Sequence, residues 1–350
     1  MQEIIKEVEQ NMNQIVKDNP NLIEKIIREI KAEVEKQNLK AEVGRTTALK
    51  NNENQKTGIT IRFDGDQAAT THYVDAYAQK MSEGASLDSV AKEIVNVAVE
   101  ARQQGFRLDF DQFNADAARE HLNLKVVGKE MNRDMEQACP HIDISGDLMA
   151  VPYWQLDNFP GGEASILMRH EFVNSMLHMT DDEVLSLARA NCLRDEYEFK
   201  GMTEVLREMI GGDMPEDMIA DMLPQEQEQM YVLGSPDRMY GATVLLDREM
   251  LNSVADRIGE ESYFILPSSI HEVLVVPRSV VDDPATLQAM VRDVNATQVS
   301  PEERLSDNVY RYDSATQKIT ICNSMDDLRQ SNTAKNTVSE ELKTGQHVRI

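Results

Sequence analysis

Two serines, a histidine and a glutamate stand close together between two apolar runs, at Ser268, Ser269, His271 and Glu272. A turn between two strands can expose such side chains at the end of a sheet, where ligands often bind. The simplest interpretation is a turn in which the hydroxyls cap backbone amides and His271 pairs locally. Ligand binding by these four residues is the functional hypothesis.

A hydrolase is the alternative interpretation of the same residues. Ser268 or Ser269 would act as the nucleophile and His271 as its general base, which requires hydrogen-bond contact between them and an oxyanion donor. Neither serine lies in a GxSxG sequence, the pattern of a nucleophile elbow. We therefore assign no catalytic residue.

A second candidate is a row of methionines, Met214, Met218 and Met222, which recur every four residues and would line one side of a short helix. Flexible methionine side chains serve either a packed core or an adaptable partner surface. The surrounding stretch, residues 181–230, has fourteen acidic and four basic side chains. An apolar stripe with a charged rim is typical of an interaction patch, so these methionines are candidates for partner binding.

Metal and nucleotide motifs are missing from the sequence. His170, Glu171 and His178 offer metal-ligating side chains, but their spacing is not HExxH, and no other histidine completes a ligand set. Neither a GxxxxGK[ST] loop nor a GxGxxG sequence is present. We predict neither a metal nor a cofactor.

Composition restricts the partners. The 350 residues carry 36 basic and 61 acidic side chains, a net charge of -25, which argues against direct binding to nucleic acid. The sequence contains no uninterrupted run of about 18 apolar residues, the length that a membrane-spanning helix requires. The expected partner is a protein or a small ligand, and an acidic decoy that occupies the basic site of a nucleic-acid-binding protein is a further alternative.

The cysteines and the first residues indicate the compartment. Cys139, Cys192 and Cys322 lie far apart and form no CxxC pair, as expected for reduced thiols. The sequence begins with mixed charges and not with the basic segment and apolar run of a secretory signal. We therefore expect a cytoplasmic protein.

Periodicity predicts the elements that position the candidate residues in the first half of the chain. Residues 1–39 form an N-terminal helical element, and its second stripe comprises Ile23, Ile26, Ile27, Ile30 and Val34. Residues 40–160 form a first αβ unit. Within it we expect a hairpin over 40–63, helices over 69–84 and 86–104, and strands over 122–128 and 147–156.

The second half is predicted in three further segments. Residues 161–228 form an acidic helical middle with a capping box at Thr180, after a short strand over 164–168. Residues 229–322 form a C-terminal αβ unit, in which MYVLGS, GATVLL, YFILPSS and HEVLVVP are strands, and 323–350 form a flexible tail. The predicted fold is α+β, with two mixed αβ units and antiparallel or mixed sheets.

Three blocks of sequence carry a resemblance: TALKNNENQKTGITIR, GASLDSVAKEIV, and ESYFILPSSIHEVLVVP followed by VRDVNATQVSPEERLSDNVYRYD. Their order and spacing, over residues 40–322, resemble the bacterial family catalogued as domain of unknown function 5688. This resemblance implies a cytoplasmic protein of gut-type anaerobic bacteria with no established activity. The LPSSIHEV segment is also similar to a distant group of uncharacterised bacillar proteins. The resemblance supplies a family and leaves the function open.

Overall fold

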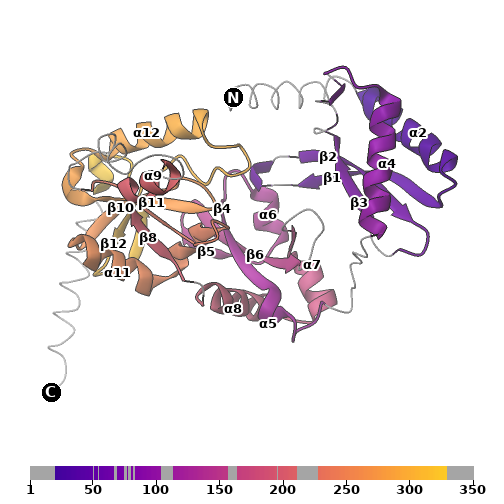
Figure 1. Ribbon diagram of the computed structural model, residues 1–350. Coiled ribbons are helices and arrows are strands. Elements are labelled where there is room, and N and C mark those ends of the chain that lie inside the picture. Colours follow the sequence, from indigo (N-terminus) through magenta and orange to yellow (C-terminus); the bar gives the residue numbers. More distant parts are fainter. Residues whose placement is uncertain are drawn as a thin grey trace. The chain divides into compact units, whose positions relative to one another are not determined.

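The computed structural model shows an α+β fold with three antiparallel sheets, as predicted (Figure 1). It describes residues 20–49, 51–53, 55–66, 69–74, 77, 80–81, 83–103, 113–156, 164–194, 196–210 and 228–328. The chain divides into two compact units. The N-terminal unit comprises Met1–His121, Trp154–Ile166 and Met176–His178, and the C-terminal unit comprises Leu122–Tyr153, Leu167–Ser175 and Met179–Ile350.

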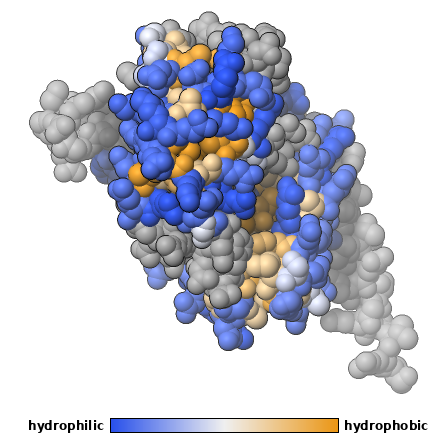
Figure 2. All heavy atoms as spheres, turned by 90° about the vertical axis from the view of Figure 1, so that its right-hand side faces the viewer, coloured by the Kyte–Doolittle hydropathy of each residue, from blue (hydrophilic) through white to orange (hydrophobic). Residues whose placement is uncertain are grey.

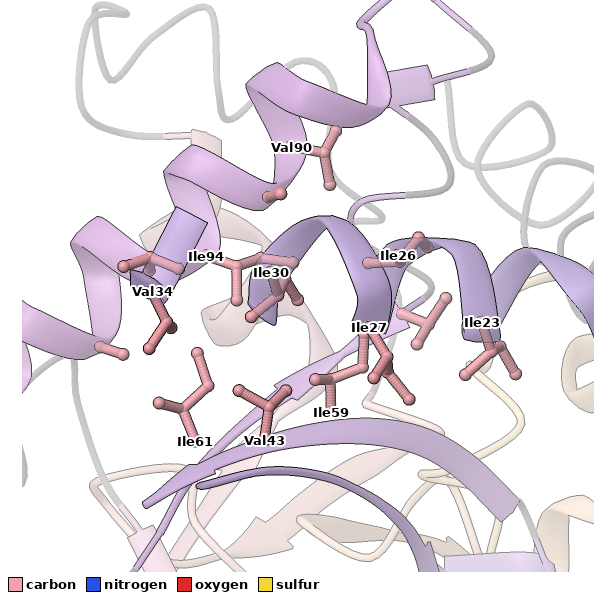
Figure 3. Close-up of a cluster of buried hydrophobic side chains, with 14 of the residues drawn as sticks. Ile23, Ile26, Ile27, Ile30, Val34, Val43, Ile59, Ile61, Val90 and Ile94 are labelled. Atoms are coloured by element: carbon pink, nitrogen blue, oxygen red, sulfur yellow. The ribbon is translucent and has the colours of Figure 1, made fainter. Parts of the chain in front are cut away.

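The core of the N-terminal unit lies between two helices and a sheet. Helix α2 (Pro20–Lys36) buries the whole predicted stripe of four isoleucines and Val34, so that part of the prediction is confirmed. Figure 3 shows these side chains in one cluster with side chains of the strands and of α4 (Leu87–Gln103). Residues 1–19, the first part of the predicted helical element, lie outside the described residues.

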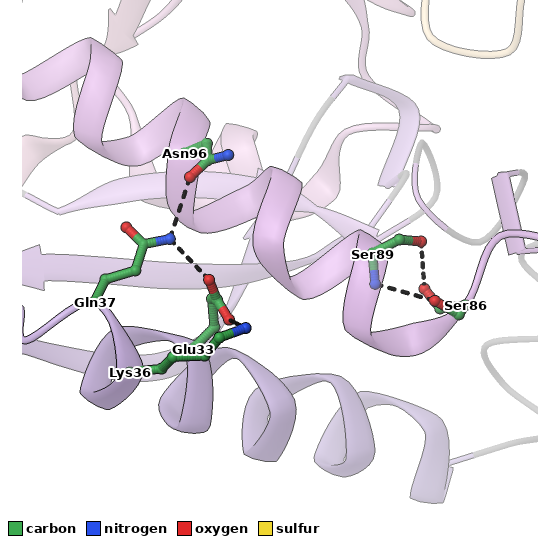
Figure 4. A network of polar contacts seen from close by, with 6 residues as sticks. All are labelled: Glu33, Lys36, Gln37, Ser86, Ser89 and Asn96. Atoms are coloured by element: carbon green, nitrogen blue, oxygen red, sulfur yellow. Dashed lines mark hydrogen bonds and ion pairs between the residues drawn. The ribbon is translucent and has the colours of Figure 1, made fainter.

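Polar contacts join the two helices at the margin of this core. The Glu33 carboxylate accepts hydrogen bonds from Lys36 Nζ at 3.0 Å and Gln37 Nε2 at 2.9 Å (Figure 4). Gln37 Nε2 also donates to Asn96 Oδ1 of α4 at 3.2 Å. Ser86 accepts from the Ser89 backbone N–H at 3.2 Å, the capping role expected from its place before the helix.

The sheet of this unit has the order β1-β2-β3, with β1 at Ala41–Leu49 and β2 at Gln55–Phe63 forming the predicted hairpin. β3 (Thr70–Tyr73) pairs with β2, so the prediction that a helix begins at residue 69 was wrong. Two threonines in this segment favour extended backbone, and the buried His72 side chain alternates with the exposed Thr71. Helical periodicity was therefore the wrong criterion here.

On the face drawn in Figure 2, hydrophilic side chains cover most of the described surface, and hydrophobic ones gather in smaller groups between them. This polarity agrees with the 28% of charged residues in the sequence, because charged side chains are mostly exposed in folded proteins.

The largest sheet lies in the C-terminal unit and has the order β13-β12-β10-β11-β9-β8. Its strands are β8 (Glu198–Gly201), β9 (Tyr231–Gly234), β10 (Ser262–Leu266), β11 (Glu272–Pro277), β12 (Tyr310–Asp313) and β13 (Lys318–Ile321). The helices of this region are α8 (Asp181–Cys192), α9 (Met202–Ile210), α11 (Arg248–Ile258) and α12 (Pro284–Thr297), with the short turn η5 (Arg278–Val280). The capping box predicted at Thr180 is present at the start of α8.

The third sheet has the order β4-β6-β5, and β7 also pairs with β6. Its strands are β4 (Leu122–Gly128), β5 (Ile142–Ser145), β6 (Leu148–Leu156) and β7 (Ala164–Leu167). The strands expected over 122–128, 147–156 and 164–168 are thereby confirmed, whereas β5 was not predicted. The short helical elements around it are α5 (Ala118–His121), α6 (Arg133–Ala138), α7 (His170–Phe172) and the π-helical turn η3 (Val173–Leu177).

The segment Gly241–Leu246 is a 3-10 helix, η4, and the prediction of a strand there was wrong. All six residues are buried. An apolar run that is buried on every side shows neither the strand nor the helix period, so the sequence could not separate the two. The Asp247 side chain then accepts a hydrogen bond from the Met250 backbone N–H at 2.9 Å and begins α11.

The first residues after β13, expected to begin the tail, pack against the C-terminal unit. Asn323 Oδ1 accepts a hydrogen bond from the Val309 backbone N–H at 2.8 Å, and Leu328 lies in the apolar cluster around Phe264 and Val291. Residues 329–350 lie outside the described part of the chain.

Candidate functional site

Three strand ends place the turn at Ser268–Glu272 beside a second loop. β10 ends at Leu266 and β11 begins at Glu272, whose backbone is paired with Gly234 at the end of β9. The turn after β10 and the loop after β9 therefore lie at the same end of the antiparallel sheet. This is the arrangement that the apolar runs on both sides of the turn predict.

Ser269 is used to hold the turn together. Its hydroxyl accepts a hydrogen bond from the His271 backbone N–H at 3.0 Å, and its own N–H donates to the Glu272 carbonyl at 3.2 Å. The neighbouring Ile270 is buried, and its N–H donates to the Glu303 carbonyl at 2.9 Å. Hydrogen bonds therefore hold Ser269 to the start of β11 and Ile270 to the segment that contains Glu303.

His271 contacts Tyr240 from the neighbouring loop in two ways. The imidazole Nδ1 accepts a hydrogen bond from the Tyr240 backbone N–H at 3.3 Å. The two rings also stack, with centroids 5.7 Å apart and planes 19° apart. Nε2 lies 3.8 Å from a carboxylate oxygen of Glu303. A neutral imidazole that accepts at Nδ1 carries its proton on Nε2, so the ring presents a donor toward that carboxylate.

Tyr240 adopts a left-handed backbone conformation that is uncommon for an aromatic residue, with φ 47° and ψ 27°. Arg238, two residues earlier, also has a positive φ of 58°. The next residue is Gly241, where an added Cβ would lie 2.4 Å from both the His271 carbonyl oxygen and the Ser235 nitrogen. The loop thus combines an unfavourable backbone with a close approach that only glycine permits.

Further side chains surround the Tyr240 ring within the C-terminal unit. The Tyr153 ring lies 4.9 Å from it, centroid to centroid, and Lys125 Nζ lies 5.9 Å from its centroid. Among the described residues, three half-buried oxygen-bearing side chains of this region make no hydrogen bond: Ser268, Tyr240 and Glu272. These groups are available to a ligand.

The contacts of Ser269 and His271 do not match those that the hydrolase interpretation requires. Within the described part of the chain, neither the Ser268 nor the Ser269 hydroxyl is hydrogen-bonded to the His271 ring. Nδ1 already accepts from the Tyr240 backbone N–H, so this nitrogen is not positioned to take a proton from a serine. The nucleophile–base contact that this mechanism requires is not formed here.

The remaining candidates from the sequence are the methionine row and the histidines His170 and His178. Met214, Met218 and Met222 lie outside the described residues, and their role stays a prediction. His170 Nδ1 lies 2.8 Å from Asp181 Oδ2, an ion-pair geometry at the start of α8. In the ranges that the structure covers, no group of three or more histidine, cysteine or acidic side chains could hold a metal ion.

The three cysteines are buried free thiols. Burial raises the pKa of the Cys139 thiol and of the Cys322 thiol to about 11. Cys192 Sγ accepts a hydrogen bond from the Leu124 backbone N–H at 3.1 Å. Because the thiolate is the reactive form, Cys139 and Cys322 are unreactive near neutral pH.

Sequence reasoning found the turn and missed the loop that faces it. Tyr240, Tyr153 and Lys125 come from three separate segments and carry no motif. The only available signal was the sequence GSPDRMYG, in which proline, aspartate and two glycines indicate a tight turn. Such composition does not show that the tyrosine itself has a positive φ.

The fold and the site together define an α+β protein with a candidate binding site built from two loops at one end of an antiparallel sheet. The chain belongs to DUF5688, a family of unknown function, whose model matches residues 20–314. This confirms the resemblance seen in the sequence. Comparison with curated proteins and with solved structures found no match.

None of the helices in the described ranges is both long enough and apolar enough to pass through a bilayer.

Proposed function

We propose that this protein binds a small ligand, without catalysis, at the site formed by Ser268–Glu272 and Tyr240. The observation that carries the proposal is the left-handed backbone of Tyr240, a strained conformation outside glycine. Strain of this kind costs on the order of 1–3 kcal/mol and persists where surrounding contacts impose it, which occurs most often at functional sites. Here the contacts are the His271 hydrogen bond and the ring stack.

The chemistry of the available groups indicates what the ligand must offer. The Glu272 carboxylate accepts hydrogen bonds only, and the Ser268 and Tyr240 hydroxyls can accept or donate. A ligand with N–H or O–H donors matches this set. The tyrosine rings beside the turn favour a ligand that also has an apolar or planar face.

A thermal-shift screen of polar metabolites tests the proposal. We expect at least one compound to raise the midpoint of the wild-type protein, because a ligand that binds only the folded state stabilises it by mass action. Tyr240→Phe and Glu272→Gln should each reduce that rise, since each removes one ligand-binding group and leaves the strands and the ring stack in place.

Tyr231→Phe is the matched control. Tyr231 is also a half-buried tyrosine of the large sheet, and it stacks on Phe199 with centroids 4.8 Å apart. This variant should respond to the compound as the wild type does. A screen in which every stabilising compound acts equally on all four proteins would rule out this site.

A further inference from the structure

A separate group of side chains in the C-terminal unit presents hydrogen-bond donors that, within the described residues, have no acidic partner. Arg248 is the first residue of α11, and among the described residues its guanidinium makes neither a hydrogen bond nor an ion pair; its Nη1 atom is buried. Arg189 of α8 donates from Nη2 to the Leu246 carbonyl at 3.2 Å, two residues before Arg248. No carboxylate of the described chain pairs with either arginine.

A third donor lies one helical turn from Arg248. Asn252 is four residues further along α11 and therefore shares its face. Its Oδ1 accepts a hydrogen bond from Tyr312 Oη at 2.9 Å, which orients the amide. The Nδ2 group then faces away from that tyrosine, and it makes no hydrogen bond in the part of the chain that the structure describes.

The electrostatics of this group are unfavourable without a counter-ion. Burial lowers the pKa of the Arg248 guanidinium, the positive charge of Arg189 lowers it further, and Tyr312 and Tyr263 oppose the change. Two arginines near one another without an acidic partner are unexpected in a chain with a net charge of -25. An anion would remove both the repulsion and the unmet hydrogen-bonding capacity.

We propose that Arg189, Arg248 and Asn252 form a binding site for a phosphate group carried by a small molecule. Guanidinium groups match phosphate oxygens in paired hydrogen bonds, and a phosphate has enough oxygens to accept from two arginines and an amide together. The large negative charge of the chain opposes the approach of a nucleic acid or an anionic membrane, which assigns the site to a small ligand. This site shares no residue with the proposed site at Tyr240.

Thermal unfolding with inorganic phosphate tests the site. The midpoint of the wild-type protein should rise with phosphate at about 10 mM, beyond the rise with sodium chloride of equal ionic strength. Arg248→Gln and Arg189→Gln should each weaken the apparent phosphate affinity by about tenfold or more, because each removes a charge-assisted contact. Arg189 is exposed, so its variant tests the site even where Arg248→Gln reduces stability.

Arg292→Gln is the control for the loss of one positive charge, because Arg292 is exposed on α12. Phosphate should raise the midpoint of this variant as much as that of the wild type. Glycerol phosphate forms a second arm: a larger shift than with inorganic phosphate assigns the site to phosphate esters, and a smaller shift assigns it to free phosphate. An equal shift with acetate would overturn the assignment to phosphate. The proposed site would be overturned if phosphate raised the midpoint of the wild type no more than sodium chloride does. It would also be overturned if both arginine variants kept the full rise that phosphate causes in the wild type.

Discussion

Gly241 is the position where the proposed ligand site leaves no room for a side chain. In Gly241→Ala the new Cβ would lie 2.4 Å from two backbone atoms, the His271 carbonyl oxygen and the Ser235 nitrogen. Neither atom can rotate away, so we expect a loss of unfolding free energy of about 1–3 kcal/mol, measured by urea denaturation.

Gly146→Ala supplies the comparison for this prediction. An added Cβ at Gly146 meets no atom within 4 Å, so this variant should stay within about 0.5 kcal/mol of the wild type. Equal stability of the two variants would show that the close approach at Gly241 does not constrain the loop.

His72 makes the N-terminal unit sensitive to acid. Burial lowers the pKa of its imidazole from 6.5 to about 4. Between these values the unfolded chain binds a proton that the folded chain does not, so stability falls as the pH decreases from 6.5 to about 4. The full loss would be on the order of 3 kcal/mol.

Hydrogen exchange of β2 amides over this pH interval measures the effect. His72→Gln lacks the titrating group, so its opening free energy should change less with pH than that of the wild type. The same pH dependence in both proteins would show that protonation of His72 does not limit stability.

Individual site residues differ in how far sequence could reveal them. Ser268, Ser269, His271 and Glu272 are adjacent in the chain, and a short turn brings adjacent residues together without knowledge of the fold. Tyr240 reaches His271 only because β9 pairs with β11. Its positive φ follows from tertiary contacts, which no local pattern records.

At the scale of the element, the start of α8 shows the strongest local determinant. Thr180 Oγ1 accepts from the Glu183 backbone N–H at 3.3 Å, and the Glu183 carboxylate accepts from the Thr180 N–H at 2.8 Å. Thr180→Ala removes one half of this reciprocal pair, so we expect a loss of about 1 kcal/mol in unfolding free energy, measured by urea denaturation.

Ser186→Ala is the control within the same helix. Ser186 is exposed in the middle of α8, where alanine is the better helix former, so the change should leave stability unaltered or raise it slightly. If Thr180→Ala and Ser186→Ala have equal stability, the capping box does not stabilise this helix.

The elements that sequence predicted correctly had a local cause. The stripe of α2, the hairpin of β1 and β2, and the capping box of α8 each depend on residues within a few positions of one another. The wrong predictions at β3 and η4 had no such local cause. β3 is defined by its pairing with β2, and η4 is buried on all sides, so tertiary contacts decided both.

At the scale of the whole molecule, the division into units depends on contacts between distant segments. The N-terminal unit includes Trp154–Ile166, and the C-terminal unit includes Leu122–Tyr153, so the chain passes between the units more than once. Composition and periodicity vary along the sequence and carry no information on such exchanges. The five consecutive segments expected from the sequence remain a prediction.

The proposed function requires the folded C-terminal unit, because Tyr240 and Ser268–Glu272 meet only when the large sheet is formed. A native mass spectrum of the full chain, purified gently from a bacterial cytoplasm and compared with its denatured mass, tests this most directly. We expect extra non-covalent mass on the wild type and on Tyr231→Phe, and less or none on Tyr240→Phe and Glu272→Gln. A wild-type chain without added mass, or equal added mass on all four proteins, would contradict ligand binding at this site.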